Sequence, residues 1–257
     1  MYLFLSDETN TTQTDAVQFL IFGAMVIPME NAPGAVKEIL EIRQCYGYPS
    51  DSEFKFDTHS RPSVVTKAKC DEAKNAVLEL AERHEMRFMA CITHHKIAIN
   101  RKQSDRVLFG LKTLLCEFDT FLTREKASGI CAIDRFEIAH SVLSSILVGG
   151  VDPDGELGKF QRHLSNIWLY SVTSISCSHL CSVCDIVLGT FRYCVNSTAK
   201  TDVAKRLYPR VRKLFLHDPN APAKIENWGL FLRPKVIRAK VYADEYEKLR
   251  VHLKNLE

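Results

Sequence analysis

Two aspartates stand at the ends of short apolar strands, where they could hold a metal ion. The strand Tyr2–Ser6 runs into Asp7 and Glu8, and the apolar segment Gly129–Ile133 runs into Asp134. If the two strands are neighbours in one sheet, their carboxylates meet where the sheet reaches solvent. Carboxylate oxygens are the ligands that hard cations prefer. The sequence therefore predicts a Mg²⁺ or Mn²⁺ site at this edge.

Three more residues join this group by their context. Asp185 lies within the otherwise apolar helical segment Cys181–Gly189, where a charge is costly to bury unless it meets a cation or a donor. The alternatives for Asp185 are a place on the polar edge of the helix and a buried partnership with Arg or Lys. In the alternating segment Glu53–Phe56, Glu53 and Lys55 share one face. We expect Glu53 to join the aspartates and Lys55 to contact a phosphate or neutralise the site.

Composition indicates a soluble globular protein. The chain has 257 residues, of which 46% are hydrophobic and 25% charged, enough for one large domain or two small ones. Its longest apolar run, residues 19–28, is too short to span a bilayer, which needs about 20 residues, and it has the composition of a buried strand. No secretory signal is recognisable, and an odd number of cysteines favours reduced thiols. We expect a cytoplasmic protein with no membrane association.

Basic residues are concentrated towards the C-terminus. From Lys200 onward, fourteen basic and seven acidic residues give +7, which leaves −4 for the rest of a chain of net charge +3. A basic flank beside an acidic centre is typical of a nucleic-acid enzyme, although a Lys/Arg-rich solvated surface is an equally good interpretation. The residues expected to contact nucleic-acid phosphates are Lys205, Arg206, Arg210, Arg212, Lys213, Arg233, Lys235, Arg238 and Lys240.

The order of elements predicts an α/β protein. We expect strands at residues 2–7, 18–27, 87–93, 130–134 and 167–172. We expect helices at residues 32–44, 62–83, 105–126, 137–148, 177–195, 203–216 and 244–256. An antiparallel opening followed by alternating helices and strands predicts one sheet with helices on its faces. We place a core at 1–198 and a basic, mainly helical extension at 199–257 that packs on it.

Four segments resemble the motifs of a known family. They are Asp7-Glu8-Thr9-Asn10, Glu53-Phe54-Lys55-Phe56, Ile133-Asp134-Arg135 and Cys181-Ser182-Val183-Cys184-Asp185-Ile186-Val187-Leu188-Gly189. In this order they are similar to a bacterial family of unknown function, domain of unknown function 3800, whose members have a ribonuclease H-like fold. The likeness runs from residue 1 to about residue 195. Thr9-Asn10 replaces the family's Ser-Gly, and Ser182 replaces a Gln.

The resemblance implies a fold and a chemistry. The fold is a ribonuclease H-like mixed sheet with helices on both faces. The chemistry is phosphodiester cleavage of DNA or RNA, with Asp7, Asp134, Asp185 and Glu53 binding two Mg²⁺ or Mn²⁺ ions about 4 Å apart. One ion would activate water and the other would stabilise the leaving oxygen. The alternative is a non-catalytic nucleic-acid-binding or regulatory protein that keeps this fold.

A cysteine pattern offers a rival chemistry. The spacing of Cys177, Cys181 and Cys184 resembles that of iron–sulfur enzymes that cleave S-adenosylmethionine. The same spacing puts all three on one face of a helix, as a buried stripe. Zinc held by these residues and His179 is disfavoured because a continuous helix cannot surround an ion with four ligands. We expect free thiols and no iron–sulfur cluster.

Two weaker patterns predict no metal site. His94 and His95 are adjacent on an extended segment, so their side chains point in opposite directions and cannot share an ion. Residues 152–155 (Asp-Pro-Asp-Gly) resemble part of a calcium loop but lack the remaining ligands at the required spacing. A turn is the better interpretation.

Overall fold

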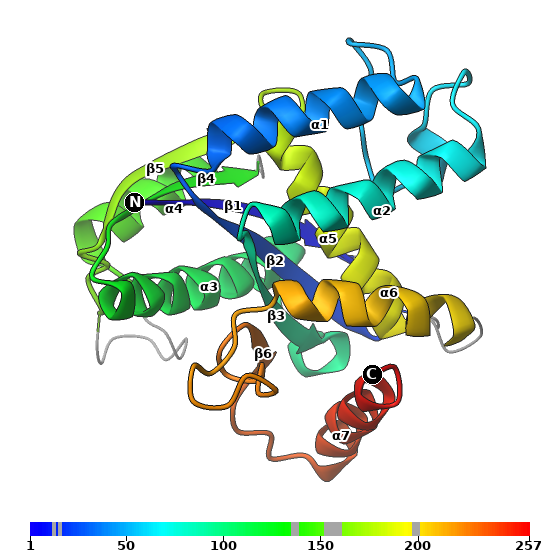
Figure 1. The fold of residues 1–257 in the computed structure, drawn as a ribbon. Coiled ribbons are helices and arrows are strands. Elements are labelled where there is room, and N and C mark those ends of the chain that lie inside the picture. Colours follow the sequence, from blue (N-terminus) through cyan, green and yellow to red (C-terminus); the bar gives the residue numbers. More distant parts are fainter. Residues whose placement is uncertain (12–13, 15–16, 135–138, 152–160, 197–200) are drawn as a thin grey trace.

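The structure, a computed structural model, describes residues 1–11, 14, 17–134, 139–151, 161–196 and 201–257. At its centre is a six-stranded mixed sheet in the order β5-β4-β1-β2-β3-β6 (Figure 1). Its strands are β1 (Tyr2–Thr9), β2 (Phe19–Pro28), β3 (Arg87–His94), β4 (Gly129–Asp134), β5 (Ile167–Thr173) and β6 (Leu230–Arg233). Strand β2 runs antiparallel to both β1 and β3, whereas the pairs β1/β4, β4/β5 and β3/β6 are parallel.

Helices cover both faces of the sheet. They are α1 (Ala32–Tyr46), α2 (Lys67–Arg83), α3 (Gln103–Glu125), α4 (Ala139–Gly149), α5 (His179–Asn196), α6 (Thr201–Leu214) and α7 (Lys240–Lys254). Helices α3 and α4 pack on one face, and α1, α2, α5, α6 and α7 on the other (Figure 1). Strand β2 is buried along its whole length. Alternate residues of β2 enter the two cores, Ile21 and Met25 one and Phe22 and Val26 the other, which is the two-residue period of a strand. The predicted α/β class with helices on both faces is confirmed.

Helix α2 begins later than the sequence predicts. Its first residue is Lys67, and its cap is Thr66, whose Oγ1 accepts a hydrogen bond from the Lys69 amide (3.3 Å). The preceding residues form a turn in which the Val65 amide donates to the Pro62 carbonyl (3.0 Å). The expected start near Ser60 and Pro62 is therefore wrong. A proline fits the first turn of a helix, but it fits a turn equally well.

Strand β6 is not expected from the sequence. Its four residues are buried and pair with β3, so the tail contributes to the central sheet. Tyr246 of α7 holds this strand in place: its hydroxyl donates to the Arg233 carbonyl (2.5 Å) and accepts from the His94 amide (2.7 Å). The neighbouring His95 is also buried. Three apolar residues followed by an arginine and a proline give too little periodicity to identify a strand.

The cysteine stripe is wrong at one position. Helix α5 begins at His179, so Cys177 precedes it and is exposed, while Cys181 is half-buried and Cys184 buried. All nine cysteines are described, and all are free thiols. Residues 152–155, where we predict a turn, lie outside the described residues. No described helix has the length and apolar character needed to cross a membrane.

Candidate metal-dependent active site

Asp7 and Asp134 lie side by side on two neighbouring strands in the centre of the sheet. Strands β1 and β4 are parallel neighbours, and Ser6 is paired with Ile133. Each aspartate is the next residue along its own strand, so the two side chains stand side by side. Asp134 ends β4, but β1 continues to Thr9, so the expectation that Asp7 ends its strand is wrong. Both line one small pocket. The predicted convergence of the two aspartates is therefore present in the fold.

Asp185 completes this pocket from α5. The helix crosses β1 closely, and the buried Cys184 thiol donates a hydrogen bond to the Leu5 carbonyl (3.2 Å). Position 185 is thereby brought over the strand end. The pocket has a volume of about 20 Å³, which is room for one water-sized group. We call this the aspartate pocket; its lining residues are Leu5, Ser6, Asp7, Asp134, Thr173, Ile175, Cys181, Cys184 and Asp185.

The carboxylates of the pocket disfavour one another's ionisation. Burial, followed by the charges of Asp185, Asp134 and Glu8, raises the pKa of Asp7 to about 8. Burial also raises the pKa of Asp185, although the Phe56 amide opposes this. A bound cation would counter both burial and repulsion. Its positive charge offsets the charges of the carboxylates, and its bonds to their oxygens replace the hydration that they lose on burial.

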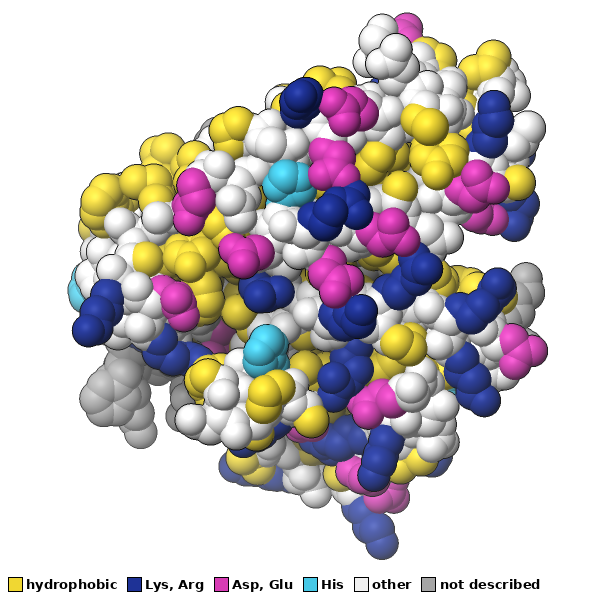
Figure 2. All heavy atoms as spheres, in the orientation of Figure 1, with side chains coloured by type: hydrophobic (Ala, Val, Ile, Leu, Met, Phe, Trp, Pro, Cys, Tyr) yellow, Lys and Arg dark blue, Asp and Glu magenta, His cyan; other side chains and the backbone are white. Residues whose placement is uncertain are grey.

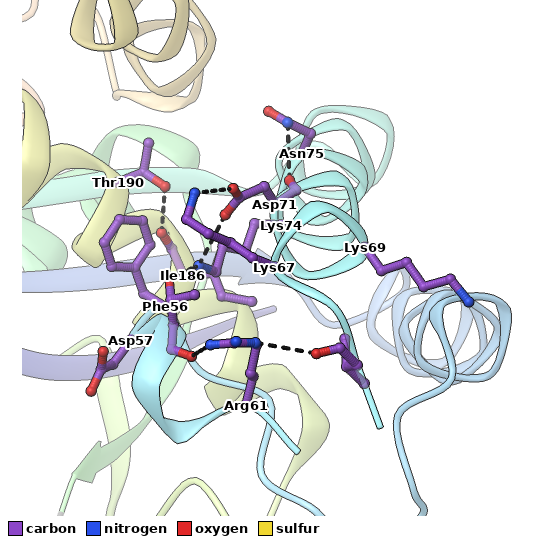
Figure 3. Close-up of polar contacts among 12 residues, drawn as sticks. Phe56, Asp57, Arg61, Lys67, Lys69, Asp71, Lys74, Asn75, Ile186 and Thr190 are labelled. Carbon is purple, nitrogen blue, oxygen red and sulfur yellow. Dashed lines mark hydrogen bonds and ion pairs between the residues drawn. The ribbon is translucent and has the colours of Figure 1, made fainter. Parts of the chain in front are cut away.

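One backbone donor fixes the Asp185 carboxylate. The Phe56 amide donates to Asp185 Oδ2 at 2.5 Å. The Phe56 ring packs against α5 directly over Gly189: a Cβ there would lie 2.2 Å from Phe56 Cγ. On its other side the ring meets Lys74 of α2, whose Nζ is 4.9 Å from the ring centroid. Figure 3 shows Phe56 together with Lys74 of α2 and with Ile186 and Thr190 of α5.

Lys55 and Glu53 lie at the rim. Lys55 Nζ is 2.6 Å from Glu53 Oε2. The bond to Glu53, and then the charges of Asp185 and Asp134, raise the pKa of Lys55. Glu53 is exposed and lines a neighbouring pocket, not the aspartate pocket. The structure thus brings the three aspartates and the charge of Lys55 together and leaves Glu53 beside them. As predicted, Glu53 and Lys55 share one face, while Phe54 is buried.

Several residues at the site are not among those selected from the sequence. Ser6 is buried in the aspartate pocket, and its hydroxyl has no hydrogen-bond partner among the described residues. The pKa of Glu8 is raised to about 7 by burial and by Asp134. Arg192 of α5 lies 5.6 Å from the Phe56 ring centroid and lowers the pKa of Asp185 by its charge. Glu8 could have been found from its place beside Asp7, whereas the other two depend on how α5 crosses β1.

The donor set suits a hard divalent cation. Three carboxylates and the Ser6 hydroxyl line one small space and offer oxygen atoms to an ion. The Cys181 and Cys184 thiols line it as well, and that of Cys184 already donates to the Leu5 carbonyl. Within the described parts of the chain, no three His, Cys, Asp or Glu residues already form a group closed enough to hold a metal ion. Ion binding would therefore require the carboxylates to close on the ion.

The basic residues of the tail fall into two groups. Ion pairs within the protein engage Arg210 with Glu79 (3.3 Å), Lys213 with Glu82 (3.3 Å), and Arg212 with Glu257 (2.7 Å). Acidic and basic side chains are accordingly interspersed on the face where α2 and α6 lie (Figure 2). Of the paired residues, Arg210 and Lys213 are still exposed. The second group is exposed and forms no ion pair with a described residue; it consists of Lys205, Arg206, Lys235, Arg238 and Lys240.

Arg233 cannot contact a nucleic-acid phosphate, which is the role that the sequence analysis predicts for it. Its side chain is 7% exposed and bonds to Glu117 at 3.2 Å, under α3. A phosphate cannot reach a guanidinium in this position. The reason is that Arg233 ends the buried strand β6, which the sequence analysis does not identify.

Comparisons with protein-family models, with curated proteins and with solved structures gave no significant match for this chain. Its candidate chemistry therefore depends on the geometry of the aspartate pocket.

Proposed function

We propose that this protein is a metal-dependent nuclease that cleaves phosphodiester bonds at the aspartate pocket. The observation that carries the proposal is the convergence of Asp7, Asp134 and Asp185, from two neighbouring strands and one helix, in a single pocket. Burial, and then the charges of Asp185 and Asp134, raises the pKa of Asp7 to about 8. Carboxylates that are held together despite repulsion are characteristic of functional sites.

The fold that fits this proposal is ribonuclease H-like. An antiparallel unit of β1, β2 and β3 is followed by β4 and β5, which add in parallel on the far side of β1. Helices on both faces agree with the mixed sheet that the family resemblance implies. The four motif segments also lie around one location, with Phe56 of the second bonded to Asp185 of the fourth.

The roles of the residues follow from their positions. Asp7, Asp134 and Asp185 would hold Mg²⁺ or Mn²⁺, which supplies an activated water and stabilises the charge of the leaving oxygen. The Phe56 amide keeps the Asp185 carboxylate oriented. Lys55, at the rim, offers a positive charge to a phosphate. Glu53 would enter the ligand set only if its ion pair with Lys55 opened.

Nucleic acid is the proposed partner. The exposed residues Lys205, Arg206, Lys235, Arg238 and Lys240 offer charges to backbone phosphates. Such contacts release counterions and recognise charge more than sequence. They do not distinguish DNA from RNA.

Metal binding tests the proposal without requiring a substrate. Thermal unfolding is followed while Mg²⁺ or Mn²⁺ is titrated into the wild-type protein and into Asp134→Asn and Asp244→Asn. A saturable rise in melting temperature is expected for the wild type and for Asp244→Asn, an exposed control on α7. The rise should be lost in Asp134→Asn. Equal rises in all three proteins would place any bound ion elsewhere.

A further inference from the structure

A second pocket adjoins the aspartate pocket, and a buried arginine contributes to its lining. Its volume is about 240 Å³, and it lies between the loop that follows α1 and the start of α5. Ile175 lines both pockets, so only a short stretch of chain separates them. We call it the serine pocket, because five hydroxyl-bearing residues line it: Ser50, Ser52, Ser176, Ser178 and Ser182.

Arg43 supplies a buried positive charge to this pocket. The residue is 4% exposed. Its Nη2 donates to the Pro49 carbonyl (2.7 Å) and to the Ser52 carbonyl (2.6 Å), and the Tyr48 ring centroid lies 5.9 Å from its Cζ. All these partners are neutral, and no carboxylate in the described chain pairs with Arg43. A guanidinium stays ionised, so its buried charge lacks a counterion.

The remaining donors of Arg43 are available for a ligand. A guanidinium has five N–H donors, and the three hydrogen bonds of Arg43 all start at Nη2. Nε and Nη1 make none to the described residues. Burial lowers the pKa of Arg43, which is the cost that an anion would relieve. Arg43 and His179 both line this pocket, and burial, followed by the charge of Arg43, lowers the pKa of His179.

Ser182 and the first turn of α5 add neutral donors. Ser182 is 3% exposed, lines the pocket, and makes no hydrogen bond to a described residue. The 18-residue helix α5 begins at His179, with Ser178 Oγ accepting from the Leu180 amide (3.2 Å). The positive end of its dipole therefore lies at the pocket.

Two acids also line the pocket. Glu53 is paired with Lys55, so its charge is neutralised. Asp51 is exposed at the rim and opposes an anion. We propose that the serine pocket binds a tetrahedral phosphate group through Arg43, Ser182 and the start of α5. The source of the phosphate rests on the proposed function: in a nuclease, it would be a substrate phosphate next to the one being cleaved.

Cys177 provides a local reporter of occupancy. Its thiol is exposed, lines the pocket, and lies 3.2 Å from Ser174 Oγ. Cys45, the other exposed cysteine, does not line this pocket and serves as an internal control. The full-length protein is alkylated with iodoacetamide in EDTA at constant ionic strength. Inorganic phosphate or chloride is added, and labelling of each cysteine is measured by peptide mass.

Phosphate, unlike chloride, is expected to slow labelling of Cys177 several-fold in a saturable manner and to leave Cys45 unaffected. Ser182→Ala and Arg43→Lys should weaken the protection. Asp51→Asn, which removes the opposing charge without touching the Arg43 contacts, should strengthen it. The inference is overturned if phosphate does not protect Cys177 in the wild type. It is also overturned if phosphate protects Cys177 equally well in the wild type, Ser182→Ala and Asp51→Asn. Asp51→Asn and Ser182→Ala keep the test decisive even if the Arg43 variant fails to fold.

A second arm identifies the source of the phosphate. A short single-stranded oligonucleotide replaces inorganic phosphate, again in EDTA, so that neither metal binding nor cleavage is needed. If the oligonucleotide protects Cys177 at a lower concentration of phosphate groups than inorganic phosphate requires, the ligand of the pocket is a substrate phosphate. Protection by the inorganic ion alone supports the pocket and rejects the substrate as its ligand. A protein that fails this test could still bind metal at the aspartate pocket, so the two proposals fail separately.

Discussion

The backbone amide of Phe56 donates to the Asp185 carboxylate at 2.5 Å, and this bond joins an irregular segment to a helix 129 residues further along the chain. The bond is possible because Gly189, one turn after Asp185, leaves space for the Phe56 ring. Two of the segments that resemble family motifs are therefore held together by a hydrogen bond and by the packing of a ring on a glycine. The aromatic residue of one packs on the glycine of the other, and the carboxylate between them is oriented as a result.

Gly189→Ala should disrupt the packing of the Phe56 ring on α5. A Cβ at position 189 would lie 2.2 Å from Phe56 Cγ and 2.4 Å from its Cβ, so the ring must move. We expect a loss of about 1–3 kcal/mol in the free energy of unfolding, from overpacking, measured by denaturant titration. Gly149→Ala is the matched control, because a Cβ there meets only the Gln161 side chain, at 3.6 Å or more.

The loss should depend on the Phe56 ring. A Phe56→Ala background removes the ring carbons and leaves only the Cβ of residue 56 near the added methyl group, so Gly189→Ala should cost less there. A double-mutant cycle with a coupling of about 1 kcal/mol or more would establish the contact. Additive effects of the two substitutions would show that the ring and the glycine act independently.

Asp7→Asn should change how stability depends on pH. An aspartate titrates near pH 4 in an unfolded chain, whereas the folded pKa of Asp7 is raised to about 8 by burial and neighbouring acids. The folded state therefore binds more protons between these values, and stability falls as pH rises from about 4 to 8. Without metal, Asp7→Asn should exceed the wild type by about 1–3 kcal/mol at pH 8.5 and approach it at pH 4.

Denaturant titrations in EDTA across this pH range provide the measurement. Asp244→Asn removes a charge from an exposed position and should follow the wild-type curve. Parallel curves for Asp7→Asn and the wild type would show that Asp7 titrates normally and that the carboxylates do not repel one another.

Tyr246→Phe should weaken the attachment of the tail to the sheet. The Tyr246 hydroxyl bridges the Arg233 carbonyl and the His94 amide, and both residues are buried. Removing it leaves two buried backbone groups unpaired, at a cost of about 1–3 kcal/mol. Thermal unfolding of Tyr246→Phe is compared with that of Tyr242→Phe on the same helix. Equal melting temperatures would mean that the bridge contributes nothing.

Charge reversal at Lys205 and Arg206 should lower nucleic-acid affinity. Both residues are exposed on α6. Each lost phosphate contact should reduce the slope of log affinity against log salt by about 0.7–0.9, as measured by fluorescence anisotropy. Arg233→Gln is unsuitable for this purpose because it removes a buried ion pair with Glu117. Unchanged affinity and slope in the Lys205/Arg206 variant would identify α6 as an ordinary solvated surface.

Some of the site could be predicted from the sequence because it depends on local patterns. An aspartate that follows a short apolar run in a strand indicates where a polar site could lie, so Asp7 and Asp134 follow from two short segments, although β1 continues past Asp7 to Thr9. Asp185 follows from the cost of a charge in an apolar helix. The alternation of residues 53–56 correctly separates the buried Phe54 from Glu53 and Lys55.

Other features depend on contacts that no local pattern specifies. The burial of Arg233 comes from strand β6, which is only four residues long. Cys177 fits the helical spacing of Cys181 and Cys184, yet α5 begins two residues later because Ser178 caps it. The exclusion of Glu53 from the aspartate pocket results from its ion pair with Lys55. In each case, tertiary contacts decide between options that the sequence leaves open.

Cleavage of nucleic acid tests the proposed function most directly. Single- and double-stranded DNA and RNA are incubated with Mg²⁺ or Mn²⁺ and the wild-type protein, Asp7→Asn, Asp185→Asn or the control Asp244→Asn. We predict metal-dependent cleavage of at least one substrate by the wild type and the control, and loss of cleavage in both pocket variants with their fold retained. Cleavage that survives in the pocket variants, or no cleavage of any substrate by a wild-type protein that metal does not stabilise, would contradict a nuclease site formed by the three aspartates.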